Sequence, residues 1–226
     1  MNIGILGTGR VARGLALRWF ERGWSVTFGS RDPATRGGEI LAPFRAIERR
    51  ADLAGGIEGA SRPQVSCVDL TRCIASSELL LAAVPWHSAI ATLSEVETGG
   101  RRVVIDCINP LRPDLAGREV PAEQSTLTIL AERYPATDFV KAFNCASSTV
   151  LADAQFPDGR PSMPYCGESA EACRTVVRLI EAAGFEPIDC GGSDAAAWLE
   201  TMVLLTIRMA LRNGWKGDCA VRWERR

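Results

Sequence analysis

The first dozen residues constrain the fold of this chain more than any other segment. An apolar run over residues 3–6 leads directly into the sequence GTGRVA at positions 7–12, and a helical pattern follows. A strand, a glycine-rich turn and a helix in this order open a βαβ unit that binds dinucleotides. Gly7 permits the tight turn, Gly9 lets the backbone approach a pyrophosphate, and Ala12 lets the helix pack against the strand. The free N–H groups at the helix N-terminus complete an anion site, so the segment predicts dinucleotide binding.

Short apolar runs alternate with helical patterns along almost the whole chain, which predicts βαβ units and a parallel sheet. Several runs are nearly continuous in apolar residues, as in a parallel sheet that helices cover on both faces. The predicted strands cover residues 3–6, 25–28, 65–68, 79–84, 103–106, 139–143, 163–166 and 186–189. We therefore expect an α/β fold with a Rossmann-type, doubly wound, mostly parallel sheet and a C-terminal helical tail.

Charge and cysteine content exclude several classes of function. The chain has 26 basic and 27 acidic residues, and this net charge of −1 argues against a nucleic-acid partner, which requires a strongly basic face. The best apolar stretch, residues 199–211, is too short to span a bilayer. The first strand begins at once, without a signal peptide before it, so we expect a cytoplasmic protein with no membrane partner. Eight cysteines without a CxxC pair, together with a single histidine, predict no metal site.

The end of the second predicted strand indicates which dinucleotide binds. NAD sites usually carry an acidic residue there, which bonds the ribose 2′-hydroxyl. This chain has Gly29, Ser30 and Arg31 instead, and a hydroxyl beside a guanidinium suits a 2′-phosphate. Asp32 is followed by Pro33, so we expect it to begin the next helix. The alternative is a solvent-exposed arginine in a turn, but the pattern favours NADP(H) as the cofactor.

The domain organisation follows from these patterns. We expect residues 1–192 to form an NADP-binding Rossmann-type domain with an extended sheet. Residues 193–226 are predicted to form a C-terminal helical segment, which is either a cap or a dimer arm. Its main helix covers residues 195–212 and ends at Asn213-Gly214, a pair typical of helix C-termini. Residues 50–63 lack a clear pattern and predict a surface loop.

Further candidate residues lie beyond the carboxyl ends of the later strands, where a doubly wound sheet binds its ligands. These ends fall at residues 84–87, 106–110 and 142–144. Pro85 stiffens the first of them and would place an apolar wall against a nicotinamide ring. The single histidine, His87, is either a general acid or an exposed residue in the first turn of a helix, and we favour the second interpretation.

We expect no catalytic side chain in this protein. The sequence lacks a Ser–His–Asp order, paired catalytic carboxylates and a P-loop lysine. Hydride transfer between two bound rings requires proximity, orientation and exclusion of water more than acid–base groups. Asn109 precedes Pro110 at a strand end. This pair is typical of turns, so Asn109 has either a structural role in a turn or a contact with the cofactor.

Seven segments of the chain occur in the same order in one known family. They lie at residues 7–12, 29–31, 85–86, 106–110, 140–144, 166–168 and 184–191. On these segments the chain resembles the NADPH-dependent reductases of coenzyme F420, the F420:NADP oxidoreductase-like proteins, over essentially its whole length. The resemblance implies hydride transfer between NADPH and a small-molecule redox acceptor, a deazaflavin or flavin-like compound with F420 favoured. It also implies a homodimer formed through the C-terminal region.

The resemblance further implies which residues contact the cofactor. They form a pyrophosphate group, a 2′-phosphate group and a nicotinamide group: Thr8, Gly9, Arg10 and Val11; Ser30 and Arg31; and Val84 and Ala142. With the strand ends included, the predicted cofactor-binding set is Gly7, Thr8, Gly9, Arg10, Val11, Ser30, Arg31, Val84, Pro85, Trp86, Asn109 and Ala142. A lysine that some members use for the 2′-phosphate is replaced here by Thr35 or Arg36.

Two alternatives remain. A non-catalytic NADP(H)-binding module, which senses redox state or serves as a partner subunit, would show the same motifs and the same lack of an acid–base pair. A β-hydroxyacid or pyrroline-carboxylate type dehydrogenase would follow this N-terminal half with a large all-helical domain. Strand-like runs continue here to residue 189, which argues against the dehydrogenase. NADPH oxidation with added acceptors separates the binding module from an enzyme.

Overall fold

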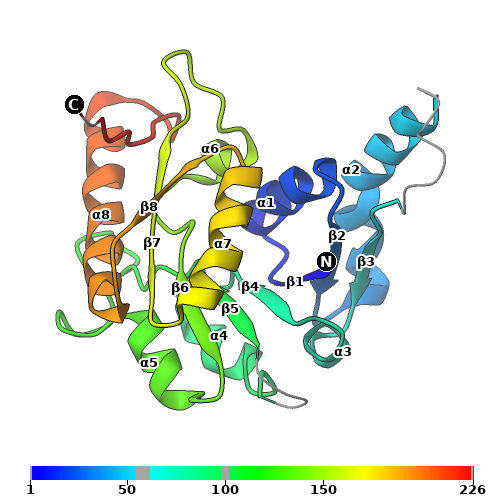
Figure 1. The fold of residues 1–226 in the computed structure, drawn as a ribbon, viewed down its shortest axis with the longest axis horizontal. Helices are drawn as coiled ribbons and strands as arrows, with labels where there is room; N and C mark the ends of the chain where they lie inside the picture. Colours follow the sequence, from blue (N-terminus) through cyan, green and yellow to red (C-terminus); the bar gives the residue numbers. More distant parts are fainter. Residues whose placement is uncertain (1, 54–61, 98–101, 225) are drawn as a thin grey trace.

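An eight-stranded sheet forms the centre of the molecule in the computed structural model, which describes residues 2–53, 62–97, 102–224 and 226 (Figure 1). The strands are β1 Asn2–Leu6, β2 Ser25–Gly29, β3 Val65–Val68, β4 Leu79–Ala82, β5 Val103–Asp106, β6 Asp138–Lys141, β7 Ser162–Gly167 and β8 Glu186–Asp189. Their order is β3-β2-β1-β4-β5-β6-β7-β8, and every neighbouring pair is parallel except β6 and β7. The predicted doubly wound, mostly parallel sheet is confirmed.

Helices cover both faces of this sheet. They are α1 Arg10–Glu21, α2 Pro33–Leu53, α3 Leu70–Ala75, α4 Trp86–Thr92, α5 Thr126–Arg133, α6 Ser148–Ala152, α7 Ala170–Ala182 and α8 Ala196–Asn213, with a 3₁₀ turn at Ser193–Ala195 before the last. In Figure 1, α2 and α8 lie at opposite ends of the molecule.

Two apolar cores result, one on each face, because successive strand residues point to opposite sides. In β4, Leu79 and Leu81 join the core under α1, α2, α6 and α7, whereas Leu80 and Ala82 join the core under α3, α4, α5 and α8. Continuous apolar strands fit this arrangement, since both faces of the sheet are buried.

The structure corrects several predicted boundaries. β4 ends at Ala82 rather than at residue 84. Pro85, which has no N–H to donate to a neighbouring strand, is the residue immediately before α4. β6 ends at Lys141 rather than at residue 143, because Phe143 has a left-handed φ of +63° that no strand accommodates. The predicted loop at 50–63 begins with helix, since α2 continues to Leu53, and residues 54–61 lie outside the described residues.

The C-terminal segment is helical only in part. α8 ends at Asn213, and Gly214 follows in the left-handed conformation with φ +70°. The chain then runs back to the start of β7, where the Ser162 N–H donates to the Val221 carbonyl and the Trp223 N–H donates to the Ser162 hydroxyl. The prediction of helix throughout residues 193–226 was therefore wrong for its last part.

The surface of this segment is rich in large apolar side chains. Those exposed on α8 and after it are Trp198, Leu205, Met209, Leu211, Trp215 and Trp223. The homodimer expected through this region stays a prediction.

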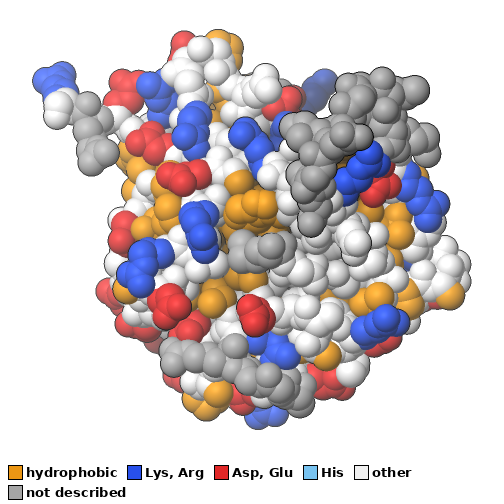
Figure 2. All heavy atoms as spheres, turned by 45° about the vertical axis from the view of Figure 1, so that its right-hand side comes forward, with side chains coloured by type: hydrophobic (Ala, Val, Ile, Leu, Met, Phe, Trp, Pro, Cys, Tyr) orange, Lys and Arg blue, Asp and Glu red, His pale blue; other side chains and the backbone are white. Residues whose placement is uncertain are grey.

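On the face drawn in Figure 2, positive and negative side chains are interspersed rather than separated by sign. No described helix is long and apolar enough to cross a membrane.

The strand β8 forms one edge of the sheet. The N–H groups of Glu186 and Cys190 donate to the carbonyls of Pro161 and Tyr165, beside and within β7. Because N–H groups alternate in direction along a strand, position 187 faces the open edge, and it is occupied by a proline.

Close packing of α1 on α6 gives the first testable prediction. A Cβ on Gly14 would lie 3.1 Å from both the Cα and the Cβ of Ala152. We expect Gly14→Val to lower the free energy of unfolding by about 1–3 kcal/mol, because the two helices cannot separate without opening the core. Denaturant titration measures the change. The same substitution at Gly38 in α2, where nothing lies within 4 Å, is the control and should change stability by less than about 0.5 kcal/mol. Equal losses at both positions would contradict the packing argument.

Candidate functional site

The turn after β1 accepts only glycine at its first position. Gly7 has φ +124°, and a Cβ there would overlap the carbonyl oxygen of Ala83. The Ala83 N–H donates to the Leu6 carbonyl at 2.9 Å, so the carboxyl ends of β1 and β4 are in direct contact. In the sheet, β1 lies between β2 and β4, so the strand order reverses its direction at the carboxyl end of β1. Doubly wound sheets bind their ligands at such a switch point.

The N-terminus of α1 is open. Gly9 precedes the helix in an extended conformation, no side chain caps the helix, and a Cβ on Gly9 would meet nothing within 4 Å. By contrast, α3, α5, α6 and α7 each begin with a side-chain cap, from Asp69, Ser125, Ser147 and Ser169. The first N–H groups of α1 are therefore free to bind oxygens of an anion, and the free space beside Gly9 admits a pyrophosphate.

Arg13 fixes the shape of the turn. Its Nε donates to the Thr8 carbonyl at 2.9 Å, and its Nη2 forms an ion pair with Glu39 of α2 at 2.8 Å. The hydrogen bond and the charge of Arg13 hold the pKa of Glu39 below its usual value, so that carboxylate stays ionised. Arg13 thus fixes the orientation of the Thr8 carbonyl at the edge of the crevice.

The end of β2 supplies a cationic pocket. Ser30 is 5% exposed, and its hydroxyl oxygen accepts the Asp32 N–H, which leaves the hydroxyl hydrogen available to a ligand. The Asp32 carboxylate accepts the Thr35 N–H as a helix cap, so the prediction that it begins the next helix is confirmed. In the described part of the chain, the exposed side chains of Arg31 and Arg36 form no ion pair.

These features surround one crevice of about 490 Å³. It is lined by Gly7, Thr8, Gly9, Gly29, Ser30, Arg31, Asp32, Arg36, Leu70, Ala83, Val84, Pro85, Ser88, Ala91 and Thr92. The structure thus brings together seven of the predicted residues, namely Gly7, Thr8, Gly9, Ser30, Arg31, Val84 and Pro85. Arg36 adds a second cation that the Ser-Arg motif alone does not indicate, although it lies in the helix that follows the motif.

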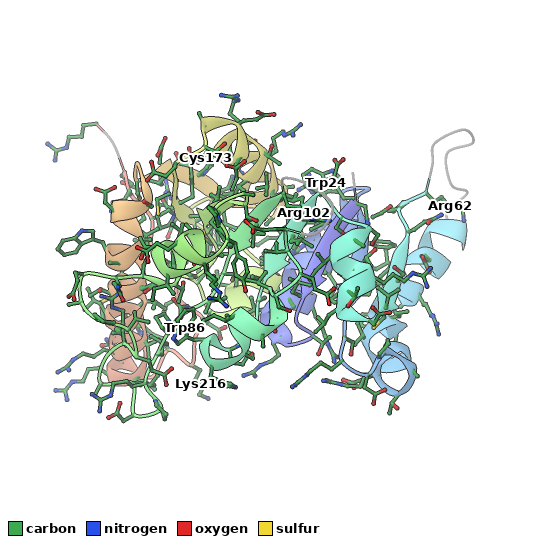
Figure 3. The ribbon with its side chains drawn as sticks, turned by 90° about the horizontal axis from the view of Figure 1, so that it is seen from below. Trp24, Arg62, Trp86, Arg102, Cys173 and Lys216 are labelled. Carbon is green, nitrogen blue, oxygen red and sulfur yellow. The ribbon has the colours of Figure 1, made fainter. Side chains whose placement is uncertain are left out.

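The other predicted residues lie outside this crevice. Arg10 is exposed at the start of α1, and Val11 packs against the core. Trp86 begins α4 and packs, half-buried, against the core under α3, α4, α5 and α8 (Figure 3). Ala142 is wholly buried, so its side chain does not line a cavity. Asn109 lies farther along, at the end of β5.

Asn109 pairs with Asn144 across the ends of β5 and β6. The Asn109 amide donates to the Asn144 carbonyl at 2.8 Å, and the Asn144 amide donates back to the Asn109 side-chain oxygen at 3.1 Å. Both residues also line a smaller hollow of about 190 Å³ against α8. The pair joins two strand ends that follow β4 in the order of the sheet.

A buried charge cluster lies just before this pair. The Lys141 Nζ lies 2.9 Å from Asp106 Oδ2 and 2.8 Å from Glu200 Oε1, and all three side chains have 0% exposure. The second Glu200 oxygen binds Arg118 at 2.9 Å. Burial acts to lower the pKa of Lys141, but the two carboxylates outweigh it and raise that pKa above its usual value. Lys141 therefore stays charged, and the cluster balances two cations with two carboxylates.

Two buried cysteines and the single histidine lie outside the lining of the crevice. Burial raises the pKa of Cys107 and Cys145 to about 12, so both stay protonated thiols at neutral pH. His87 is exposed, and the crevice is lined by other residues of α4. Among the described residues, no group of three His, Cys, Asp or Glu is placed to hold a metal ion.

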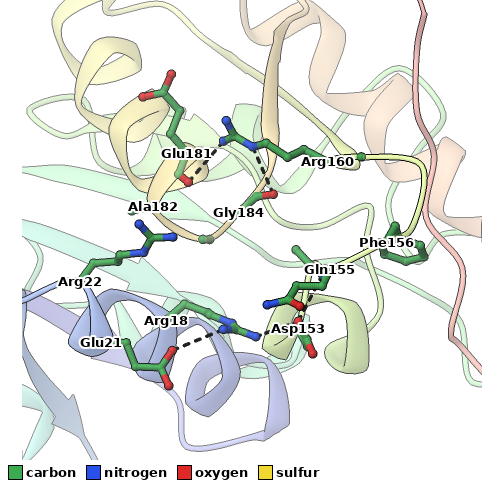
Figure 4. Close-up of a pocket in the computed structure, with 13 residues that line it drawn as sticks. Arg18, Glu21, Arg22, Asp153, Gln155, Phe156, Arg160, Glu181, Ala182 and Gly184 are labelled. Atoms are coloured by element: carbon green, nitrogen blue, oxygen red, sulfur yellow. Dashed lines mark hydrogen bonds and ion pairs between the residues drawn. The ribbon is translucent and has the colours of Figure 1, made fainter. Parts of the chain in front are cut away.

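A larger hollow of about 610 Å³ lies at the other end of α1 (Figure 4). Some of its charged groups are already paired, since Arg18 forms ion pairs with Glu21 and Asp153 at 3.3 and 3.0 Å. Arg160 donates to the carbonyl of Glu181 near the end of α7. Helix C-termini repel anions, so this hollow does not suit a pyrophosphate.

Comparison with known proteins agrees with this geometry. Residues 2–110 match the family model described as NADP oxidoreductase, coenzyme F420-dependent. The N-terminal half of the chain is therefore similar to this family. The matched residues contain the β1 turn, the end of β2 and the end of β4, which together form the crevice. NADP(H) is therefore the dinucleotide that the crevice suits.

Three relatives extend the comparison beyond residue 110. The F420-dependent NADP reductase of Methanothermobacter thermautotrophicus is 27% identical over 224 residues, covering 94% of this chain and 90% of that protein. Metalloreductase STEAP3 of Rattus norvegicus is 32% identical over 203 residues, but this chain spans only 36% of its length. A crystal structure from Arthrobacter sp. FB24, assigned as an F420-dependent NADP reductase, superposes with a TM-score of 0.80 at 25% identity and 99% coverage of both chains.

The open space beside Gly9 gives the second prediction. We expect Gly9→Val to abolish NADPH binding in a calorimetric titration, because its side chain would occupy the place of the pyrophosphate. The melting temperature should stay unchanged, since nothing lies within 4 Å of the new Cβ and the backbone is extended there. Gly38→Val is the matched control and should bind normally. Normal binding by Gly9→Val would place the dinucleotide elsewhere.

Proposed function

We propose that this oxidoreductase transfers hydride between NADPH and a deazaflavin or flavin-like acceptor, with coenzyme F420 favoured. The observation that supports the proposal is the crevice itself, which is lined by the glycine-rich turn before α1, by Ser30, Arg31 and Arg36, and by an uncharged wall after β4. NADPH supplies a hydride when bound, and the chain has to bind it, orient it and keep water away.

The two ends of the crevice differ in charge, which supports this assignment. Arg31 and Arg36 lie at the β2 end and would hold the 2′-phosphate, with the Ser30 hydroxyl as a further donor. At the β4 end the lining residues are Val84, Pro85, Ser88, Ala91 and Thr92, none of which titrates. A wall without an ionisable side chain suits an acceptor that takes hydride directly onto its own ring.

The relatives support the acceptor in different degrees. A protein named F420-dependent NADP reductase aligns along nearly its whole length with this chain, which favours a deazaflavin. A metalloreductase aligns with this chain over about a third of its own length, so ferric ion is a second acceptor to test. The non-catalytic binding module remains the alternative function.

Turnover with a panel of acceptors tests the proposal. NADPH oxidation is followed with F420, FMN, FAD and a ferric chelate, and F420 should give the highest kcat/KM. The Gly9→Val variant is the negative control, since it should lose turnover with every acceptor. Tight NADPH binding without oxidation by any acceptor would support the binding module instead.

The cofactor preference is a third prediction. NADPH should bind more than about tenfold tighter than NADH, and Arg31→Ala and Arg36→Ala should each remove much of that preference. Loss of one charge-assisted contact costs about 1.5–3 kcal/mol, and NADH affinity should hardly change because NADH has no 2′-phosphate. Arg133→Ala, at an exposed site on α5, is the control. Equal affinities of the wild type for the two cofactors would refute the 2′-phosphate assignment.

The role of His87 gives a fourth prediction. An obligatory general acid would lose about 10²–10⁴-fold in turnover when replaced. We expect His87→Ala to lose less than about tenfold, because the side chain is exposed and the crevice is lined by other residues of α4. Trp86→Ala should cost more, since its ring packs against the core beside Pro85. Collapse of turnover in His87→Ala, with Trp86→Ala little affected, would return His87 to the catalytic residues.

A further inference from the structure

The buried charge cluster has no role in the proposed chemistry, yet it lies on the side of the sheet order towards which a bound dinucleotide would extend. The 2′-phosphate pocket is at β2 and the pyrophosphate turn is at β1, so the remaining half of the dinucleotide extends over β4 towards β5 and β6. Asp106 and Lys141 are the last residues of β5 and β6, and they are register partners in the sheet. The cluster therefore lies at the strand ends towards which a dinucleotide bound in the crevice would extend its nicotinamide half.

The cluster clamps the backbone that follows β5. Asp106 Oδ1 accepts the Ile108 N–H at 2.9 Å, and Lys141 Nζ donates to the Ile108 carbonyl at 2.9 Å. Both polar groups of this one residue are thus held by the two charged side chains. Asn109 follows at once and pairs with Asn144, so its position depends on the clamp.

The backbone after β6 is held in a strained conformation at the same place. Phe143 adopts φ +63°, which a bulky residue rarely does and which persists only where the surroundings impose it. Its carbonyl accepts the Cys107 thiol, and it lies between Lys141 and Asn144 in the chain. Backbone strain of this kind is concentrated at functional sites.

Glu200 is the member of the cluster that comes from farthest away in the chain. It lies on α8, and its Oε1 accepts both the N–H and the hydroxyl of Thr126 at 2.8 Å, in addition to its contact with Lys141. The Thr126 hydroxyl oxygen also lies 2.6 Å from Asp106 Oδ2, so the two carboxylates share its single hydrogen. Removal of the Glu200 charge would leave Lys141 and Arg118 with one carboxylate between them.

We propose that Glu200 is a positioning residue for the nicotinamide half of the dinucleotide, acting through Lys141 and Thr126 on the strand ends that carry Asn109 and Asn144. The inference rests on the proposed use of NADPH. It assigns to the last helix a part in the geometry of hydride transfer, although Glu200 is fully buried and touches no ligand itself.

Glu200→Gln tests this assignment, since it keeps the size of the side chain and removes the charge. We expect the Kd for NADPH, measured by calorimetry, to stay within about threefold, because the phosphate contacts share no partner with the cluster. The fluorescence enhancement of the bound nicotinamide should fall, and turnover with the best acceptor should drop at least about tenfold. The primary deuterium isotope effect with C4-deuterated NADPH should rise as hydride transfer becomes limiting.

Two further variants complete the experiment. Glu132→Gln, on an exposed site of α5, makes the same change of charge without buried partners and should match the wild type. Thr126→Val keeps every charge and removes the hydroxyl that links Glu200, Asp106 and Lys141. Thr126→Val should show the same unchanged Kd, with smaller losses of nicotinamide fluorescence and turnover. If Glu200→Gln fails to fold, Thr126→Val decides whether the cluster positions the nicotinamide.

The outcomes separate this inference from the proposed function. Wild-type fluorescence enhancement and isotope effect in Glu200→Gln or Thr126→Val would overturn the positioning role. A parallel loss of NADPH affinity, fluorescence and turnover would also overturn it, because it would indicate a general structural role. If the wild type binds NADPH but reduces no acceptor, the proposed hydride transfer fails, while Kd and nicotinamide fluorescence still decide the role of Glu200.

Discussion

Lys141 and Asp106 meet at the ends of neighbouring strands with no exposed surface, and much of the C-terminal half is arranged around that contact. Glu200 of α8 and Thr126 of α5 both contact this pair. Arg118, which binds Glu200, also donates to the carbonyls of residues 121, 122 and 124 in the loop before α5. Removal of one partner from a buried pair costs about 3–5 kcal/mol, because the other charge stays buried without compensation. The β5, β6, α5 and α8 elements therefore hold one arrangement together, since each supplies a charge or a hydrogen bond that the others require.

The N-terminal half works by a different constraint, which is steric rather than electrostatic. The backbone at Gly7 approaches Ala83 so closely that no side chain fits, and the open end of α1 faces the resulting crevice. The backbone and the helix dipole thus suit an anion, and Arg31 and Arg36 line the same crevice. In the proposed function, one half of the sheet would bind the phosphates, and the other holds the strand ends at which the nicotinamide would lie.

The sequence predicts the first half far better than the second. The β1 turn, Ser30 and Arg31 form local motifs whose geometry follows from a few consecutive residues, and the structure places them in one crevice. Lys141, Asp106 and Glu200 are far apart in the chain, and a charged residue inside a strand carries no local signal of its partner. Ala142 has a fully buried side chain in the core, and its expected place beside the nicotinamide stays a prediction.

Pro187, in the edge strand β8, has a consequence for how copies of this protein behave in solution. An exposed edge strand offers a row of N–H and C=O groups to which a strand of another molecule can add, which is a common route to aggregation. Since the N–H groups of Glu186 and Cys190 are used by β7 and its flank, Asp189 is left as the outward donor within β8. A ladder cannot extend across a position that lacks a donor, so the proline protects this edge against strand addition.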